Sequence, residues 1–388
     1  MNILMLDLMG SFIVGDLHYT FIKLGHKCKF FQYVLKDKEW NEEFATALRK
    51  ELQEGSFDMV YETNYYPTVA KVCYLNNIPH CCWVYDSPPE ISSTETMDYP
   101  TNRIFFFCKN DYLIFKNIHG LDTVYYLPLA VNTDRLDKIN RADRYACDIS
   151  LVGGLYKSGT LLGYKSIMTP EQQQYVDAMI QVQITRAGSG VIDAALTPDF
   201  VNGVKKHYLE LSEKAIQPEK AHLFYAICAH IAHVERLSLL RLFGDRGYDT
   251  RLFFGKIKDE DRELLAGHKV KLCESVSYEM EMPQVFKSSK INLNPVLRAN
   301  RGGIPLRAVD VLGCGGFLLT SHQEEMEEYF RPDEIVTFAT IEEAVDKADY
   351  YLAHESERIL IARKGYEKAK KDFSYEERAR MLIEKCMR

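Results

Sequence analysis

The sequence contains no Cys-x-x-Cys pair, although it has ten cysteines in 388 residues. Scattered cysteines of this kind favour reduced, buried thiols over a disulfide framework or a zinc site. No apolar run approaches the length of about 20 residues that spans a bilayer. The first ten residues, MNILMLDLMG, show neither a basic segment nor a small-residue cleavage site. They are predicted to form a first strand, and the protein is expected to be cytoplasmic.

An excess of positive charge is also missing. The chain carries 48 lysines and arginines against 55 aspartates and glutamates, a net charge of −7. This balance lacks the electrostatic footprint of a general nucleic-acid-binding protein, although it is compatible with a local basic pocket. The rest of the composition, 46% hydrophobic and 27% charged, is that of a soluble globular protein. Because 388 residues exceed what one hydrophobic core usually supports, we expect two domains.

Short apolar runs alternate with helical patterns through roughly the first 140 residues. Strands are predicted at residues 3–8, 28–33, 57–62, 80–85, 103–108 and 123–127. Such alternation predicts an open parallel sheet, whose ligands bind beyond the carboxyl ends of the strands. Those ends carry the loops at 10–16, 62–66, 86–89 and 129–132. The charged stretch 134–144 has little apolar content and is predicted to be a linker.

A second alternation begins with a strand at 147–152 and the glycine loop Gly153-Gly154. Residues from about 160 to 243 show no strand pattern and are predicted to be helical. The stretch 221–243 is long and largely apolar, so we expect it to be buried. Strands return at 251–254 and 270–273, and two charged amphipathic helices are predicted at the end, at 356–371 and 375–386.

The stretch Lys290 to Ser321 combines a strand, a glycine-rich loop, a helix and a second strand. Pro305 stands where the helix is predicted to begin, because its missing N–H is not needed there. A loop of this kind points backbone N–H groups and a helix N-terminus at a ligand, which favours an anion such as phosphate. The alternative is that the glycines serve only close packing.

Several stretches together resemble the CgeB-like, spore-maturation group of GT-B glycosyltransferases, whose C-terminal domain is of the group 1 glycosyl transferase type. They are WVYDSP (83–88), YYLPLAVN (125–132), LVGGLY (151–156), YEMEMPQVFKSSKINLN (278–294) and GIPLRAVDVLGCGGFLLT (303–320). Their order and spacing match along nearly the whole chain, which makes the joint occurrence more specific than any one motif.

The resemblance implies an α/β fold with two Rossmann-like domains facing a central cleft. The acceptor-side domain is expected at 1–140, joined by the last helix at 373–388. The nucleotide-sugar-binding domain is expected at 146–372, with a helical insertion at 160–243. A nucleotide-diphosphate-sugar, most simply a UDP-sugar, is the implied donor, with a protein or glycan as acceptor and no obligatory metal or other cofactor.

Donor binding is assigned to several groups of residues. Without a metal, the leaving diphosphate needs fixed cations and N–H dipoles, and the candidates are Arg298, Arg301, Arg307 and Gly302-Gly303, followed by Pro305 and Leu306. The alternative is that these arginines are solvated rim charges. In similar GT-B enzymes a carboxylate at the position of Asp310 binds the ribose hydroxyls. The usual pattern is Glu-x7-Glu, but Gly302 stands at its first place.

Two further loops are assigned to the donor. Ser275, Val276 and Tyr278 follow a predicted strand and are expected to cover the base and read it by backbone contacts. For Tyr278 the alternative is a packing aromatic at a helix start. Gly153, Gly154 and Tyr156 are expected near the phosphates.

Catalysis is assigned to Asp16 as the base and to Arg307 as the stabiliser of the leaving group. The alternative for Asp16 is a helix N-cap. His18 and Asp86 are weaker candidates, and Gly10, Ser11 and Asn64 complete the expected acceptor side.

Two features are set aside. The triplet Asp259-Glu260-Asp261 is interpreted as a solvated capping cluster, not as an Asp-x-Asp metal motif. His222, His230 and His233 lack an evident carboxylate partner for a metal. The alternatives to a glycosyltransferase are a non-catalytic scaffold of the same fold and a nucleotide-sugar epimerase or hydrolase.

Overall fold

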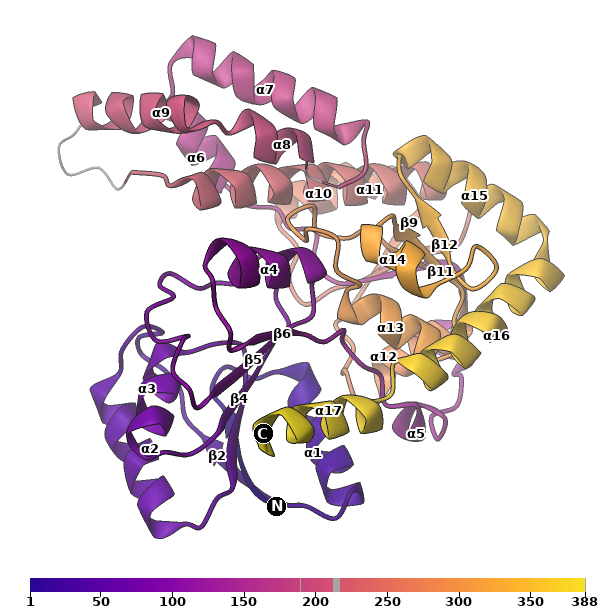
Figure 1. Cartoon of the computed structure of the whole chain (residues 1–388). Coiled ribbons are helices and arrows are strands. Elements are labelled where there is room, and N and C mark those ends of the chain that lie inside the picture. Colours follow the sequence, from indigo (N-terminus) through magenta and orange to yellow (C-terminus); the bar gives the residue numbers. More distant parts are fainter. Residues whose placement is uncertain (189, 212–216, 388) are drawn as a thin grey trace. The chain divides into compact units, whose positions relative to one another are not determined.

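The computed structural model describes residues 1–188, 190–211 and 217–387. The chain divides into two compact units. Unit 1 comprises Met1–Arg135, Gly302–Val309 and Lys368–Arg388, and unit 2 comprises Leu136–Arg301 and Asp310–Glu367. Each unit is built on its own six-stranded parallel sheet (Figure 1).

The sheet of unit 1 has the order β2-β1-β3-β4-β5-β6. Its strands are β1 (Asn2–Asp7), β2 (Lys27–Gln32), β3 (Met59–Thr63), β4 (His80–Val84), β5 (Asn102–Phe106) and β6 (Val124–Tyr126). β3 and β4 are buried along their whole length, because helices cover both faces of a parallel sheet. The order reverses between β1 and β3, so their carboxyl ends flank the switch point where ligands bind in open sheets.

Helices from both ends of the chain cover unit 1. α1 (Phe12–Lys23) and the last helix, α17 (Tyr375–Met387), lie side by side and share one core with Trp83 (Figure 1). α2 (Glu42–Glu54) and α3 (Pro67–Leu75) pack into another core with Leu4 and Leu6. Shorter helical pieces follow at α4 (Lys109–Leu113), the π-helical Ile114–Ile118 and α5 (Thr133–Leu136).

The sheet of unit 2 has the order β12-β11-β10-β7-β8-β9, and each pair of neighbouring strands is parallel. Its strands are β7 (Cys147–Val152), β8 (Thr250–Phe253), β9 (Val270–Cys273), β10 (Ser289–Asn294), β11 (Leu318–Ser321) and β12 (Val336–Phe338). This is the strand order of a dinucleotide-binding domain, with its switch point between β7 and β10. The predictions for β7 and β9 are confirmed residue for residue.

A layer of helices follows β7. It consists of α6 (Thr160–Ser166), α7 (Pro170–Ile184), α8 (Gly190–Ala195), α9 (Pro198–Leu211) and α10 (Lys220–Asp245). These helices enclose a core of their own, to which Val176, Ile192 and Ile227 contribute. The prediction of a helical segment with a long buried helix at 221–243 is confirmed for the described residues. α10 is long and apolar enough to span a membrane, but 72% of its most apolar window is buried, as expected of a core helix.

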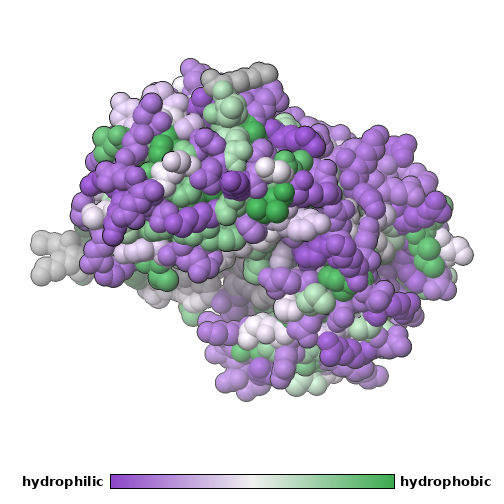
Figure 2. Space-filling model, turned by 90° about the horizontal axis from the view of Figure 1, so that it is seen from below, coloured by the Kyte–Doolittle hydropathy of each residue, from purple (hydrophilic) through white to green (hydrophobic). Residues whose placement is uncertain are grey.

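The remaining elements complete unit 2 and the crossing back to unit 1. They are the 3-10 helix Asp143–Tyr145, α11 (Asp259–Ala266), α12 (Glu281–Ser288), α13 (Leu306–Gly313), α14 (Glu324–Tyr329), α15 (Ile341–Ala353) and α16 (Glu355–Asp372). Hydrophilic residues cover most of the face shown in Figure 2, and hydrophobic residues occur there in small groups. All ten cysteines are free thiols, eight of them buried.

Candidate functional site

The switch point of unit 2 lies beside the loop that follows β7. Gly153 has a φ of 142° and Tyr156 has a φ of 59°, both in the left-handed half of conformational space. Gly154 and Tyr156 are exposed. The sequence predicts that these three residues bind the donor, and they lie beyond the carboxyl end of β7, the strand that pairs with β10. This is the position at which doubly wound sheets bind their ligands.

Arg236 of α10 joins the two loops that flank this switch point. Its guanidinium donates hydrogen bonds to the carbonyl oxygen of Gly154 and, from Nε at 3.2 Å, to that of Pro295, which follows β10. Its Cζ atom lies 4.4 Å from the centre of the Tyr156 ring, a cation–π distance. Arg236 is only 6% exposed. Sequence reasoning missed it, although an arginine inside a largely apolar helix is a usable signal, because a buried charge needs partners.

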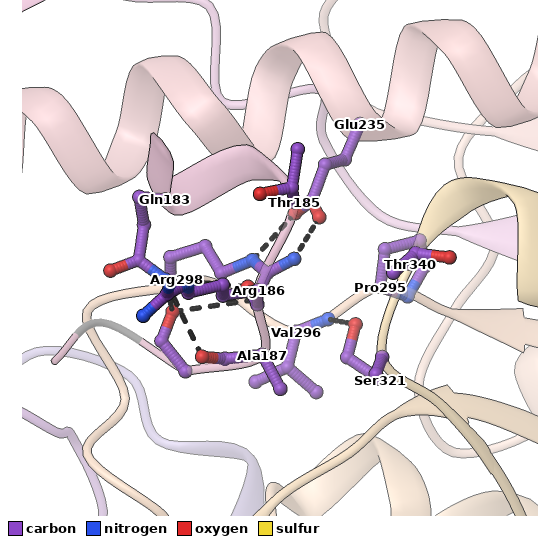
Figure 3. A network of polar contacts seen from close by, with 12 residues as sticks. Gln183, Thr185, Arg186, Ala187, Glu235, Pro295, Val296, Arg298, Ser321 and Thr340 are labelled. Carbon is purple, nitrogen blue, oxygen red and sulfur yellow. Dashed lines mark hydrogen bonds and ion pairs between the residues drawn. The ribbon is translucent and has the colours of Figure 1, made fainter. Parts of the chain in front are cut away.

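Glu235, the preceding residue of α10, holds the same loop at Arg298 (Figure 3). Arg298 Nε donates to Glu235 Oε2 at 2.9 Å, and a second hydrogen bond joins Arg298 Nη2 to Oε1, so the pair is bidentate. Arg298 Nη1 donates to the carbonyl oxygens of Arg186 at 2.8 Å and Gly188 at 3.3 Å. Both side chains of the ion pair are at most 3% exposed. We therefore assign Arg298 to the framework of the loop, neither to the rim nor to direct donor contact.

The other predicted diphosphate residues continue along the chain. The Arg301 guanidinium is 5.2 Å from the Phe224 ring of the helical layer. Gly302 has a φ of 131°. Gly303 is closely packed within unit 1, where a Cβ at this position would come within 2.7 Å of Phe107. Leu306 packs against the core shared by α1 and α17, and Pro305 and Arg307 are half-buried. The close packing at Gly303 explains why Gly302–Val309 counts with unit 1.

Tyr278 and Asp310 are brought together, as partners in a hydrogen bond. The Tyr278 hydroxyl donates to Asp310 Oδ1 at 3.0 Å, and both residues are buried. Tyr278 precedes α12, which begins only at Glu281. Ser275 is exposed and Val276 is half-buried in the loop after β9. Tyr278, which is predicted to cover the base, and Asp310, which is predicted to bind the ribose, are thus in direct contact in unit 2.

Asp16 is not the N-cap of α1, so that alternative is wrong. Ser11 caps the helix by accepting a hydrogen bond from the Ile13 N–H at 3.4 Å. The buried Asp16 carboxylate instead accepts from Arg135, at 2.8 Å from Nε and 2.7 Å from Nη2, and from the Asn132 amide at 2.9 Å. These contacts give Asp16 a structural role, in which it fixes the residues after the strand-end loop 129–132.

We expect Asp16→Asn to lower the free energy of unfolding of unit 1 by about 2 kcal/mol, because a hydrogen-bonded charge pair is lost. Trp40 and Trp83 are the two tryptophans of the chain and both lie in unit 1, so tryptophan fluorescence during a urea titration reports this unit. Asp134→Asn, which removes an exposed partner of Lys23, is the control and should stay within about 0.5 kcal/mol. Wild-type stability combined with lost sugar transfer would instead support the base hypothesis.

Asn64 and Asp86 meet at the carboxyl ends of β3 and β4. Asn64 Nδ2 donates to Asp86 Oδ2 at 2.7 Å, and Asn64 Oδ1 accepts from the Tyr85 N–H at 3.1 Å. They line a cavity of about 210 Å³ that lies within unit 1. The walls of this hollow raise the pKa of Asp86 because they replace part of its water, while the hydrogen bond from Asn64 opposes the shift. Asp86 is nevertheless exposed.

The remaining acceptor-side candidates have local contacts. Gly10 adopts a φ of 69°, and its N–H donates to Asp7 Oδ1 at 3.2 Å. The His18 ring lies 4.6 Å from the Phe30 ring of β2. His18 therefore packs against the sheet edge, which fits a structural histidine.

The interpretation of the acidic triplet as solvated is wrong for Asp261. This residue is 1% exposed, and its Oδ1 lies 3.3 Å from Lys157 Nζ and 3.4 Å from His233 Nε2. His233 Nδ1 also bonds the Leu155 carbonyl at 3.0 Å. These residues tie the loop after β7 to α10 and α11. In the parts of the chain that the structure describes, no group of three or more His, Cys, Asp or Glu side chains is arranged to hold a metal.

A larger hollow of about 480 Å³ lies at the opposite edge of the unit 2 sheet. Cys147 and Ser289, at the amino ends of β7 and β10, line it together with Gly316. Parallel sheets bind their ligands at the carboxyl edge. We therefore place the candidate site at the switch point and assign no function to this hollow.

Comparison with known proteins identifies relatives in part of the sequence and in the fold. Residues 228–384 match the protein family described as Glycosyl transferase-like. No curated protein matches the chain. Among solved structures, a glycosyltransferase from Rickettsia africae has a TM-score of 0.58 at 10% identity, and sucrose-phosphate synthase from Thermosynechococcus elongatus has 0.58 at 9%. In both cases the match covers 99% of this chain and 97% of the other.

HepE from Anabaena, solved in complex with UDP-glucose, has a TM-score of 0.56 at 11% identity, with 99% of each chain covered. At these identities the likeness shows the fold alone. It confirms the predicted fold class, in which two Rossmann-like α/β domains are accompanied by a helical segment. The chain thus has the GT-B fold, and its residues 228–384 are similar to the family described as Glycosyl transferase-like.

Proposed function

We propose that the chain is a glycosyltransferase of the CgeB-like group. It moves a sugar from a nucleotide-diphosphate-sugar to a hydroxyl or amide of a protein or of a cell-surface or spore glycan. The observation that carries the proposal is the unit 2 switch point, where Arg236 holds the glycine loop after β7 to the loop after β10. A UDP-sugar is the favoured donor, since HepE was solved with UDP-glucose and a trehalose-6-phosphate protein from E. coli with UDP-2-fluoro glucose.

Within this proposal, different residues bind different parts of the donor. Asp310, oriented by the Tyr278 hydroxyl, serves the ribose. Arg301, Arg307 and the backbone N–H groups of Gly302 and Gly303 stabilise the diphosphate as it leaves, which fixed charges and dipoles accomplish without a metal. Guanidinium groups suit this task because they match phosphate oxygens bidentately.

The test is a panel of nucleotide sugars assayed for binding and for release of the nucleoside diphosphate. Arg307→Ala should weaken binding of the accepted donor at least tenfold, or about 1.4 kcal/mol, through loss of a charge-assisted contact. The affinity of Arg307→Lys for the donor should lie between those of the wild type and Arg307→Ala, because an ammonium group cannot reproduce the planar fork of a guanidinium group. Arg363→Ala is the matched control, because the Arg363 side chain on α16 is 73% exposed. This variant should bind the donor as tightly as the wild type does.

Two outcomes would favour the alternatives. If no panel member binds or turns over and Arg307→Ala changes nothing, the chain is a scaffold of this fold and not an enzyme. If the donor is consumed without any acceptor and yields an epimer or a free sugar, the enzyme is an epimerase or a hydrolase. The products distinguish these cases directly.

A further inference from the structure

The cavity of unit 1 lies where its sheet favours a ligand. Its lining includes Met9 after β1, Asn64 after β3 and Tyr85 after β4, and the strand order reverses between β1 and β3. Asn64 holds a left-handed conformation, with a φ of 62°, which asparagine tolerates better than most residues. Its side chain can therefore bridge Asp86 and the Tyr85 N–H. The topology and the polar lining thus point independently to a binding site.

The charged lining of this cavity is mainly acidic. Glu39, Asp86 and Glu90 contribute three carboxylates and Lys38 one ammonium group. Lys38 forms an ion pair with Glu90, so its charge is already matched. The Ser92 hydroxyl donates to Glu39, which joins the two loops that form the outer wall. Such a lining disfavours a negatively charged ligand through repulsion and through the cost of desolvating unpaired charges.

The N-terminus of α3, which also borders the cavity, does not reverse this preference. A helix N-terminus attracts anions through its unpaired N–H groups. Here the Tyr66 N–H, at the cap of α3, donates to the buried carboxylate of Glu62 at 3.1 Å. The same oxygen of Glu62 also lies 2.8 Å from His80 Nε2. The protein thus supplies its own carboxylate to this helix end.

Size and aromatic content narrow the ligand further. Pockets for drug-sized ligands measure about 300–1,000 Å³, so a cavity of about 210 Å³ suits one ring. Tyr65, Tyr66 and Tyr85 offer aromatic faces, and Asn64 and Asp86 offer hydrogen-bonding groups for hydroxyls. We infer that this cavity binds a single hydroxylated ring without negative charge, as the terminal sugar of the acceptor. The inference rests on the proposed function, because it takes the ring to be the acceptor.

The experiment compares rings that differ in charge, in the absence of donor. Methyl glucoside, methyl glucosaminide, glucuronate and glucose 6-phosphate are titrated into the full chain, and binding is followed by saturation-transfer NMR and by the tryptophan indole N–H signals. The neutral and cationic rings should bind at least tenfold more tightly than the two anions. The signal of Trp40, beside Glu39, should shift, while that of Trp83, whose indole N–H is bonded to the Leu127 carbonyl, should not.

Matched variants test the electrostatic cause. Asp86→Asn should reduce the discrimination against glucuronate to less than about threefold, because one repelling charge is removed while its shape is kept. Glu54→Gln removes the same charge at the far end of α2, from a side chain that is 66% exposed, and should leave the discrimination unchanged. The inference is overturned if an anionic ring binds as tightly as methyl glucoside, or if Asp86→Asn and Glu54→Gln behave alike.

Failure of this inference and failure of the proposed function remain distinguishable. Donor turnover with binding of anionic rings would remove only the inference. Absence of any nucleotide-sugar binding would remove the proposed function, and with it the acceptor role of the ring, whatever rings bind to unit 1.

Discussion

Replacing Glu235 with alanine is expected to lower the free energy of unfolding of unit 2 by about 3–5 kcal/mol, the cost of leaving one charge of a buried pair alone. Arg298 would keep its contacts to the carbonyl oxygens of Arg186 and Gly188 but lose both carboxylate oxygens. Both side chains of the pair are almost fully buried, so water cannot replace the missing partner at little cost. The loss of unfolding free energy should therefore be much larger than the loss on breaking an exposed ion pair.

Far-UV circular dichroism during a urea titration measures this loss. Helices of both units contribute to its signal, so the unfolding of unit 2 is included. Tryptophan fluorescence follows unit 1 alone and serves as the internal reference. Glu210→Ala, at a 58% exposed partner of His207 on α9, should change stability by less than about 1 kcal/mol. The double change Glu235→Leu with Arg298→Met should recover much of the loss, because a buried pair can be replaced by apolar packing. A stable single variant would contradict the role given to this pair.

The fold was largely readable because its strands are continuous apolar runs between turn signals. β7 and the buried helix α10 were predicted from such patterns. α2 was not predicted, although its buried residues Phe44, Leu48 and Leu52 recur at helical spacing within a charged stretch. The register and order of the strands came only from the structure, since several parallel orders satisfy the same pattern.

The sequence predicted which types of residue belong to the candidate site, but it did not predict their ion-pair partners. Asp16 was nominated from its place near the first strand-end loop, yet its partner Arg135 lies 119 residues away in the sequence. Arg298 was nominated as a cation for phosphate, whereas Glu235, 63 residues earlier, neutralises it. Local patterns reveal which groups carry chemistry. Some of these groups are engaged in buried ion pairs instead. Long-range packing decides which ones, and a single sequence does not show that packing.

The structure also assigns α10 a role that its sequence did not suggest. Two consecutive residues of this helix hold the loop after β10, Glu235 at Arg298 and Arg236 at Pro295. Through Arg298 the same loop is bonded to the carbonyl oxygens of Arg186 and Gly188 in the helical layer. The helical layer therefore supports the switch point directly, which makes it part of the candidate donor site and not a separate appendage.

Arg236→Met is expected to lower the free energy of unfolding of unit 2 by about 2–4 kcal/mol, because the buried carbonyl oxygen of Pro295 and the partly buried hydrogen bond to Gly154 lose their donor. It should also weaken binding of the accepted nucleotide sugar more than tenfold, since the glycine loop is no longer held beside β10. Arg236→Lys should recover only part of both losses, because one ammonium group lacks the rigid fork that reaches both carbonyl oxygens.

Circular dichroism in urea and calorimetric titration with the nucleotide sugar measure the two effects separately. Arg246→Met is the matched control, because Arg246 follows α10 and pairs with Asp349 at a side chain that is 38% exposed. It should change stability by no more than about 1 kcal/mol. If Arg236→Met keeps wild-type stability but loses donor binding, Arg236 contacts the donor itself. If stability and binding both stay unchanged, Arg236 does not hold the switch point, and the proposed function loses the observation that carries it.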